Sequence, residues 1–88
     1  GELRFTGVQA DALPGSADGR VLAELIARGR VLHAADTLGA AWYMLDQAVA
    51  YAGTREQFGR KIASFQAVKH LCAEMAAQLE PCRALVWY

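Results

Sequence analysis

Apolar residues recur at three- and four-residue steps over residues 20–53. The positions in this pattern are Leu25, Leu32, Ala35, Leu38, Trp42, Leu45, Val49 and Ala52. Such steps gather side chains on one face of a helix, so the pattern predicts a long amphipathic helix. Ser16 or Asp18 is expected to cap its start, and Gly53 to end or weaken it.

A second helical pattern begins after Ser64 and continues to the end of the chain. Its apolar positions are Phe65, Val68, Cys72, Met75, Leu79, Cys82 and Val86. Ser64 is a suitable N-cap residue, and Pro81 predicts a kink between residues 77 and 81. Because residues 54–63 form a short connection, the two helices are expected to pack as an antiparallel hairpin.

The first nineteen residues differ from the rest in pattern. Residues 2–8 alternate between apolar and polar side chains, which predicts a short half-buried β-strand. Residues 9–19 contain the turn-forming sequence Pro14-Gly15-Ser16 and are expected to be a linker. The predicted fold class is therefore mainly α, with a short N-terminal strand followed by a long antiparallel helical hairpin. Since a lone strand is not stable, its sheet is expected to lie elsewhere.

The chain is small and strongly apolar, with 88 residues of which 55% are hydrophobic. A helical hairpin of this size cannot cover both of its faces, so further chain or a second subunit is expected to do so. Both ends are expected to be cut, which would make the chain a fragment of a larger protein. Nine basic and nine acidic residues without a basic block argue against nucleic acid or an anionic membrane as partner.

The two cysteines, Cys72 and Cys82, lie ten positions apart in the second predicted helix. That spacing corresponds to ~15 Å along a helix, too far for a disulfide. We expect both to be small buried hydrophobic residues in a reducing compartment, and therefore a cytoplasmic protein. The residues suggest no metal site, and no set of side chains forms a complete catalytic centre.

The connection between the helices has the most distinctive chemistry. Residues 55–62 read Arg-Glu-Gln-Phe-Gly-Arg-Lys-Ile and are followed by Phe65-Gln66. Guanidinium groups bind anionic oxygens, amides bind polar edges, and aromatic rings offer flat surfaces. This combination suits a ligand that carries phosphates and rings. Residue types alone leave a solvated corner as the more frequent alternative.

Residues 51–70 closely resemble a motif in the carboxy-terminal helical domain of acyl-CoA dehydrogenases. That motif contains an arginine, then Gln-Phe-Gly, a short variable step and Phe-Gln. The resemblance implies that residues 1–19 are the end of a β-domain with its linker, and residues 20–88 part of a C-terminal four-helix bundle. It also implies FAD as cofactor and oxidation of an acyl-CoA to the trans-2-enoyl-CoA.

The resemblance further implies roles for individual residues. The expected FAD contacts, made to the cofactor of a neighbouring subunit, are Arg55, Gln57, Phe58, Phe65 and Gln66. Arg30 matches an arginine near the acyl-CoA site. Ala27 stands where several members carry a substrate-binding aspartate, and Gly29 where a minority carry the catalytic glutamate. The chain is therefore expected to contain no catalytic residue and to be inactive alone.

Two other interpretations remain open from the sequence. The apolar seams also suit a cofactor-free helical module for interaction or oligomerisation. The chain also suits the non-catalytic subunit of a heteromeric dehydrogenase. Homo- and hetero-oligomers are both compatible with the pattern, and the identity of the acyl substrate does not follow from it.

Overall fold

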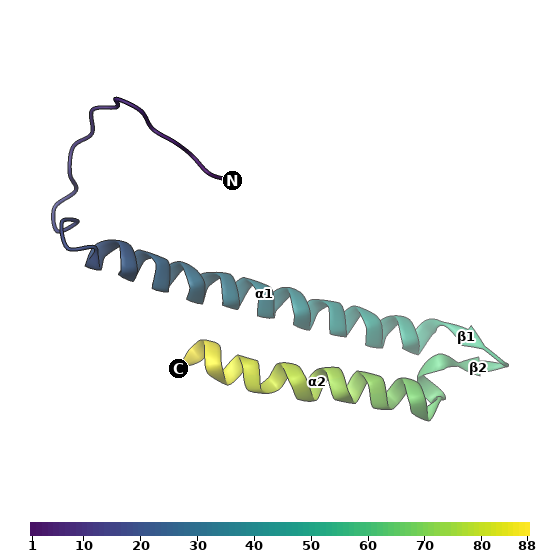
Figure 1. The fold of residues 1–88 in the computed structure, drawn as a ribbon. Coiled ribbons are helices and arrows are strands. Elements are labelled where there is room, and N and C mark those ends of the chain that lie inside the picture. The colour runs from purple at the N-terminus through teal and green to yellow at the C-terminus, as the bar shows by residue number, and fades with distance from the viewer.

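The computed structural model describes all residues from Gly1 to Tyr88. It consists of α1 (Arg20–Thr54), β1 (Glu56–Gln57), β2 (Arg60–Lys61), the 3₁₀-helix η1 (Ile62–Ser64) and α2 (Gln66–Trp87). The two α-helices lie antiparallel, and the small hairpin of β1 and β2 projects from the end where they are joined (Figure 1). The prediction of a mainly α fold with a long helical hairpin is confirmed.

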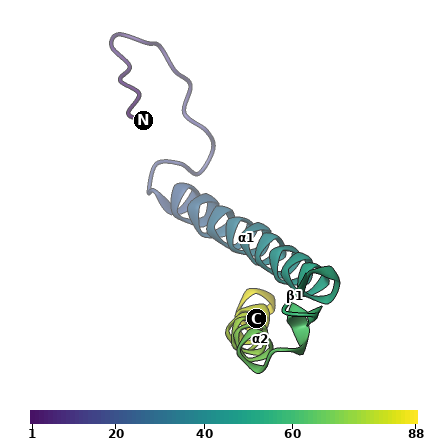
Figure 2. The same ribbon diagram turned by 90° about the vertical axis from the view of Figure 1, so that its right-hand side faces the viewer.

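The helices pair over only part of α1. The N-terminal part of α1 extends past the C-terminal end of α2, and the axes of the two helices cross at an angle (Figures 1 and 2). The molecule is consequently elongated, with extents of 70 × 30 × 15 Å. Neither helix has an apolar stretch long enough to cross a membrane.

The interface between α1 and α2 contains only part of the predicted apolar seams, since the seam residues Leu25, Leu32 and Cys82 are exposed. Leu45 and Ala52 are the only buried residues in the molecule. Half-buried side chains around them include Leu38 and Trp42 of α1 and Val68 of α2. A hairpin of this size cannot enclose both faces, as expected. Leu25 and other large apolar side chains therefore remain exposed on the rest of α1.

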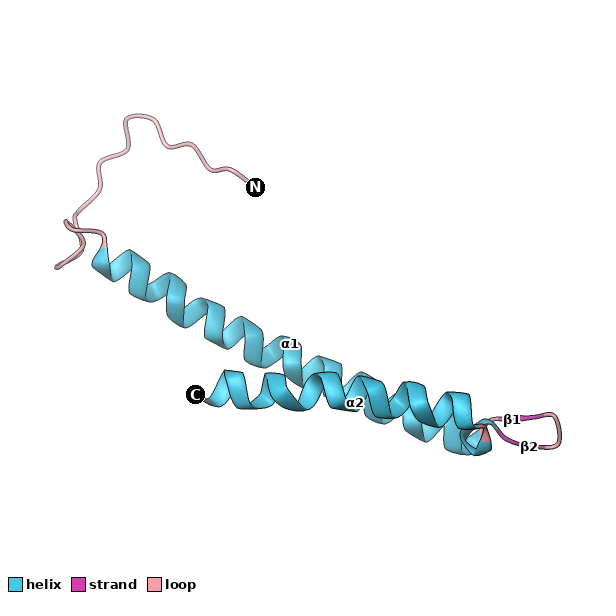
Figure 3. Ribbon diagram, turned by 60° about the horizontal axis from the view of Figure 1, so that its bottom comes forward, coloured by secondary structure: helices cyan, strands magenta, loops and turns pink.

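The strand predicted at residues 2–8 is not formed. Residues 1–19 contain no regular secondary structure, and Leu3 and Phe5 are exposed. The physical reason is that backbone N–H and C=O groups of a strand need a partner strand, and the chain offers none to this segment. In Figure 3 the segment is an extended loop that leads into α1.

The helix ends differ in detail from the predicted caps. Gly19 is the N-cap of α1 and adopts φ 73°, while the carboxylate of Asp18 accepts the N–H of Arg20 at 3.1 Å. Ser64 does not cap α2: Phe65 occupies the N-cap position, and the Ser64 hydroxyl instead donates to the carbonyl of Lys61 at 2.7 Å. The extra 3₁₀ turn moves the start of α2 beyond Ser64.

Pro81 and both cysteines lie within α2. The α-helix continues through Pro81 to Trp87, and the kink expected between residues 77 and 81 stays a prediction. Cys72 and Cys82 are both free thiols. Cys72 is half-buried, but Cys82 is exposed, so the prediction that both are buried is wrong for Cys82. Its thiol donates to the carbonyl of Gln78, one turn earlier in α2, at 3.4 Å.

Candidate functional site at the interhelical hairpin

The connection between the helices is a β-hairpin with a two-residue turn. Glu56 pairs with Lys61, and Gln57 pairs with Arg60. The turn residues Phe58 and Gly59 both have positive φ angles, 54° and 75°. Positive φ at both central positions is the requirement of a type I′ turn, which matches the twist of antiparallel strands. The hairpin therefore has a defined register, where the sequence predicted only an irregular corner.

Phe58 occupies an unfavourable backbone conformation at the tip of this turn. It is the only non-glycine residue of the chain with positive φ, and 91% of it is exposed. The left-handed region costs an L-residue roughly 1–2 kcal/mol, more for bulky side chains than for Asn or Gly. Burial within the chain does not offset this cost. Residues held in strained backbone conformations concentrate at functional sites.

Three side chains form a cluster between the hairpin and the start of α2. The rings of Phe58 and Phe65 meet edge to face, with centroids 6.1 Å apart and planes at 86°. The guanidinium carbon of Arg60 lies 4.0 Å from the centroid of the Phe65 ring. Edge-to-face aromatic pairs and cations over ring faces are both attractive arrangements. The cluster links the hairpin tip to the N-cap of α2.

Arg55 and Gln57 lie on the hairpin itself. Arg55 is the C-cap of α1 in an extended conformation, and its N–H donates to the Tyr51 carbonyl at 2.9 Å. Its carbonyl accepts the N–H of Ile62 at 2.8 Å, which extends the pairing of the two strands toward the helices. The Gln57 amide donates to the carbonyl of Glu56 at 2.9 Å.

Gln66 lies one residue beyond the cluster, in the first turn of α2. Its amide and the ring nitrogen Nε2 of His70 are 2.8 Å apart, within hydrogen-bonding distance. The first turn of α2 carries no acidic residue, so the free N–H groups at this helix end are not neutralised by a neighbouring carboxylate. The electrostatic character of the corner is therefore positive.

The structure brings five of the six predicted site residues together. Arg55, Gln57, Phe58, Phe65 and Gln66 all belong to the hairpin or the adjoining start of α2. Arg30 does not join them. It is exposed on α1 twenty-five residues before Arg55, about 37 Å away at ~1.5 Å per residue. Two separate locations therefore carry the predicted ligand contacts.

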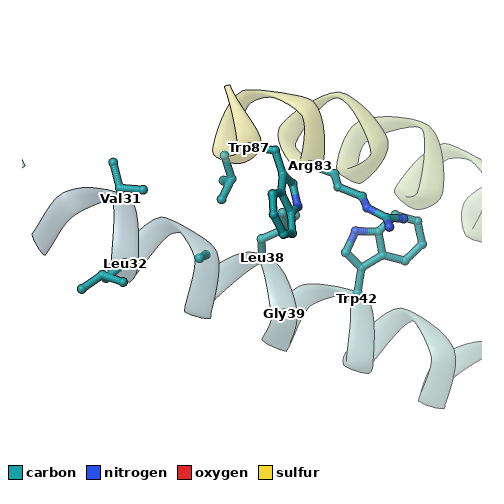
Figure 4. A pocket seen from close by; sticks show the side chains of 9 residues that line it. Val31, Leu32, Leu38, Gly39, Trp42, Arg83 and Trp87 are labelled. Atoms are coloured by element: carbon teal, nitrogen blue, oxygen red, sulfur yellow. The ribbon is translucent and has the colours of Figure 1, made fainter. Parts of the chain in front are cut away.

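An apolar groove lies between the middle of α1 and the end of α2. Its volume is about 560 Å³, and the side chains that line it include Leu38 and Trp42 from α1 and Arg83 and Trp87 from α2. Arg83 extends from α2 toward Trp42, and it is the only charged residue of the lining (Figure 4). The indole nitrogen of Trp42 is buried and has no hydrogen-bond partner. The groove has no set of groups suited to catalysis.

Residues 18–88 match the family described as acyl-CoA dehydrogenase, C-terminal domain. The chain belongs to the acyl-CoA dehydrogenase family. The family resemblance inferred from residues 51–70 is thereby confirmed.

Several curated acyl-CoA dehydrogenases and related proteins are similar to this chain. Acyl-CoA dehydrogenase FadE34 of Mycobacterium tuberculosis is 62% identical over 47 residues, which are 53% of this chain and 7% of that protein. Acyl-CoA dehydrogenase IpdE2 of Mycolicibacterium smegmatis is 42% identical over 81 residues, 88% of this chain and 25% of that protein. The caffeyl-CoA reductase-Etf complex subunit CarC of Acetobacterium woodii is 44% identical over 59 residues, 67% of this chain and 16% of that protein.

The chain thus spans a quarter or less of the length of each of these three proteins. No solved structure matches the chain.

Sequence reasoning missed two features of the corner. It did not predict the two-residue hairpin, since Phe-Gly lacks the Asn or Asp that usually marks a type I′ turn. It also assigned no role to Arg60, which the motif treats as part of a variable step. The spacing of five residues between Arg60 and Phe65 gives no indication of their contact, because it depends on the turn of η1 between β2 and α2.

Proposed function

We propose that this chain is the part of an FAD-dependent acyl-CoA dehydrogenase that contacts the dinucleotide portion of FAD through the interhelical hairpin. The full enzyme would catalyse α,β-dehydrogenation of an acyl-CoA to the trans-2-enoyl-CoA. Residues 1–19 would be the end of the β-domain and its linker, and residues 20–88 the first half of the C-terminal helical bundle. Membership of the family supports the class of reaction.

One observation supports this role for the hairpin most strongly. Arg55 and Gln57 lie two residues apart in extended backbone, so their side chains share one face of the hairpin. Arg55 forms no ion pair within the chain. A guanidinium with unpaired donors beside a carboxamide and an exposed aromatic ring is a suitable surface for phosphate oxygens and a nucleotide ring.

The residues present fit the cofactor by their chemistry. Arg55 would hold phosphate oxygens of FAD, Gln57 and Gln66 would bond polar edges, and Phe58 and Phe65 would pack against flat surfaces. When bound, FAD would supply the hydride acceptor of the reaction. The chain's own residues would contribute binding and orientation, because none of them forms a base and partner suited to proton abstraction.

The exposed apolar surface supports an oligomer or a larger helical bundle around this chain. Only Leu45 and Ala52 are buried, and the groove beside Trp42 is open. Large uncovered apolar surfaces mark interfaces. We therefore assign the hairpin to an interface where it serves the cofactor of a neighbouring subunit. Acyl-CoA would be bound elsewhere in the full enzyme, with Arg30 near it.

The proposal is tested by the affinity of the full polypeptide for FAD. Arg55→Ala is expected to raise the FAD dissociation constant about tenfold or more, because a charge-assisted hydrogen bond contributes ~1.5–3 kcal/mol. The matched control is Arg28→Ala, which removes an exposed arginine from α1 away from the hairpin. Equal FAD affinity of the wild type and Arg55→Ala would refute the assigned contact.

A second candidate function follows from the open groove rather than from the hairpin. An apolar groove of about 560 Å³ with a single arginine is also suited to a cofactor-free interaction module or a non-catalytic subunit. Such a protein would oligomerise through the same seams without binding flavin. Titration of the full polypeptide with FAD distinguishes the two functions, because only the first predicts saturable binding.

A further inference from the structure

The register of the hairpin places a third residue on the face that carries Arg55 and Gln57. Gln57 and Arg60 are directly opposed across the strands. Directly opposed residues of an antiparallel pair project from the same face, and residues two apart on one strand do so as well. Arg55, Gln57 and Arg60 therefore share one face, while Glu56 and Lys61 share the other.

Arg60 is held in position by an aromatic surface. Its guanidinium carbon lies 4.0 Å from the centroid of the Phe65 ring, and Phe58 supports Phe65 from the side at 86°. A guanidinium over the face of a ring leaves N–H donors at its edge available to a ligand. The stacking also reduces the side-chain freedom that a ligand would otherwise have to restrict on binding.

The donors of Arg60 have no partner within the chain. The ion pairs of the molecule join Arg4 to Glu2, Arg20 to Asp18 and Arg28 to Glu24. None of the side-chain hydrogen bonds involves Arg60 either. A positioned guanidinium with all donors free is complementary to the paired oxygens of a phosphate group.

We propose that Arg60 is a second phosphate-binding residue of the hairpin, acting beside Arg55 on the phosphate oxygens of FAD. This inference rests on the proposed function, since it takes the hairpin as the FAD contact. It adds a residue at a variable position of the motif, and it assigns Phe65 the additional task of positioning Arg60. The two arginines would both contact the pyrophosphate, Arg55 from the residue before β1 and Arg60 from β2.

The test compares Arg60→Gln with Lys61→Gln in the full polypeptide. Both variants remove one positive charge from β2, but the side chains lie on opposite faces of the hairpin. FAD dissociation constants are measured at low and high salt, with Arg55→Ala alongside. Coenzyme A binding is measured for the same variants, because its phosphates are the other source of the same ligand chemistry. Arg60→Lys retains the charge without the planar fork.

Arg60→Gln is expected to weaken FAD binding about tenfold, and Lys61→Gln about twofold or less. The salt dependence of FAD affinity should fall in Arg60→Gln more than in Lys61→Gln, because a direct phosphate contact is lost. Arg60→Lys should recover part of the affinity, and coenzyme A binding should not change.

Three results would overturn the inference, and they are distinguishable. If Arg55→Ala weakens FAD binding but Arg60→Gln matches Lys61→Gln, the proposed function stands and the role of Arg60 is refuted. If Arg55→Ala has no effect, the proposed function fails and this inference fails with it. A change in coenzyme A binding without a change in FAD binding would also refute the assignment to FAD.

Discussion

The guanidinium carbon of Arg60 lies 4.0 Å from the centre of the Phe65 ring, although the two residues belong to different elements on either side of η1. This contact links β2 to the N-cap of α2. The projecting hairpin carries most of the residues proposed to contact FAD.

Loss of the ring should free the Arg60 side chain. Phe65→Leu keeps an apolar residue at the N-cap of α2 but removes the ring face under the guanidinium, an interaction of roughly 0.5–1 kcal/mol at an exposed site. We expect faster motion of the Arg60 side chain, measured by ¹⁵N relaxation of its Nε in labelled protein. Unchanged Arg60 dynamics in Phe65→Leu would show that the stacking does not position the arginine.

The strained turn predicts opposite effects on stability and on cofactor binding. Phe58→Asn places a residue that tolerates positive φ before Gly59. When it is made in the Phe65→Leu variant, where the edge-to-face contact is already absent, it should raise the free energy of unfolding by about 1 kcal/mol. The same change should weaken FAD binding because the exposed ring is lost. Chemical denaturation and FAD titration measure the two effects. A double variant that is less stable than Phe65→Leu alone would contradict the assignment of strain to Phe58.

How far the sequence predicted this structure depends on the range of the interactions involved. The bounds of α1 and α2 followed closely from apolar periodicity, because helical hydrogen bonds are local and one face of each helix meets the other. The strand at residues 2–8 was predicted wrongly, because strands require distant partners. The burial of Cys82 was also predicted wrongly, since it depends on which surface covers the end of α2.

The candidate site was predicted through the family motif more than through residue chemistry. The motif gave Arg55, Gln57 and Phe58 as neighbours, and the hairpin places them in one connected element. It gave no indication that Arg60 shares their face, because that follows from the register of two very short strands. Residue preferences do not predict a turn in which a phenylalanine adopts positive φ, because Asn, Asp and Gly are the usual residues there.

The packing between the helices predicts a strong effect at Leu45. Leu45 is one of two buried residues, so Leu45→Ala should lower the free energy of unfolding of the full polypeptide by ~2–5 kcal/mol. Leu45→Met conserves the volume and should cost under about 1.5 kcal/mol. Equal destabilisation by both substitutions, measured by urea denaturation, would indicate that Leu45 does not fill a packed interface.

The start of α1 should depend on pH through Asp18. Hydrogen bonds from the backbone N–H and the side chain of Arg20 hold the pKa of the Asp18 carboxyl below its usual value of 3.8. Because the folded-state pKa is the lower one, the stabilising contribution is present above the unfolded pKa. It is lost as the pH falls through the folded pKa.

The amide proton shift of Arg20, followed by NMR from pH 6 downward, should report this titration below pH 3.8. Asp18→Asn should abolish the shift change while α1 remains helical. A shift that moves equally in Asp18→Asn would mean that another group is responsible for the pH dependence.

The most direct test of the whole account is the flavin content of the full polypeptide that contains these residues. We predict that the purified protein shows the visible absorbance of an oxidised flavin, or that apoprotein acquires it on addition of FAD, with one FAD bound per subunit. A folded, oligomeric protein that remains colourless and binds no added FAD would contradict the assignment of the hairpin to a flavoenzyme.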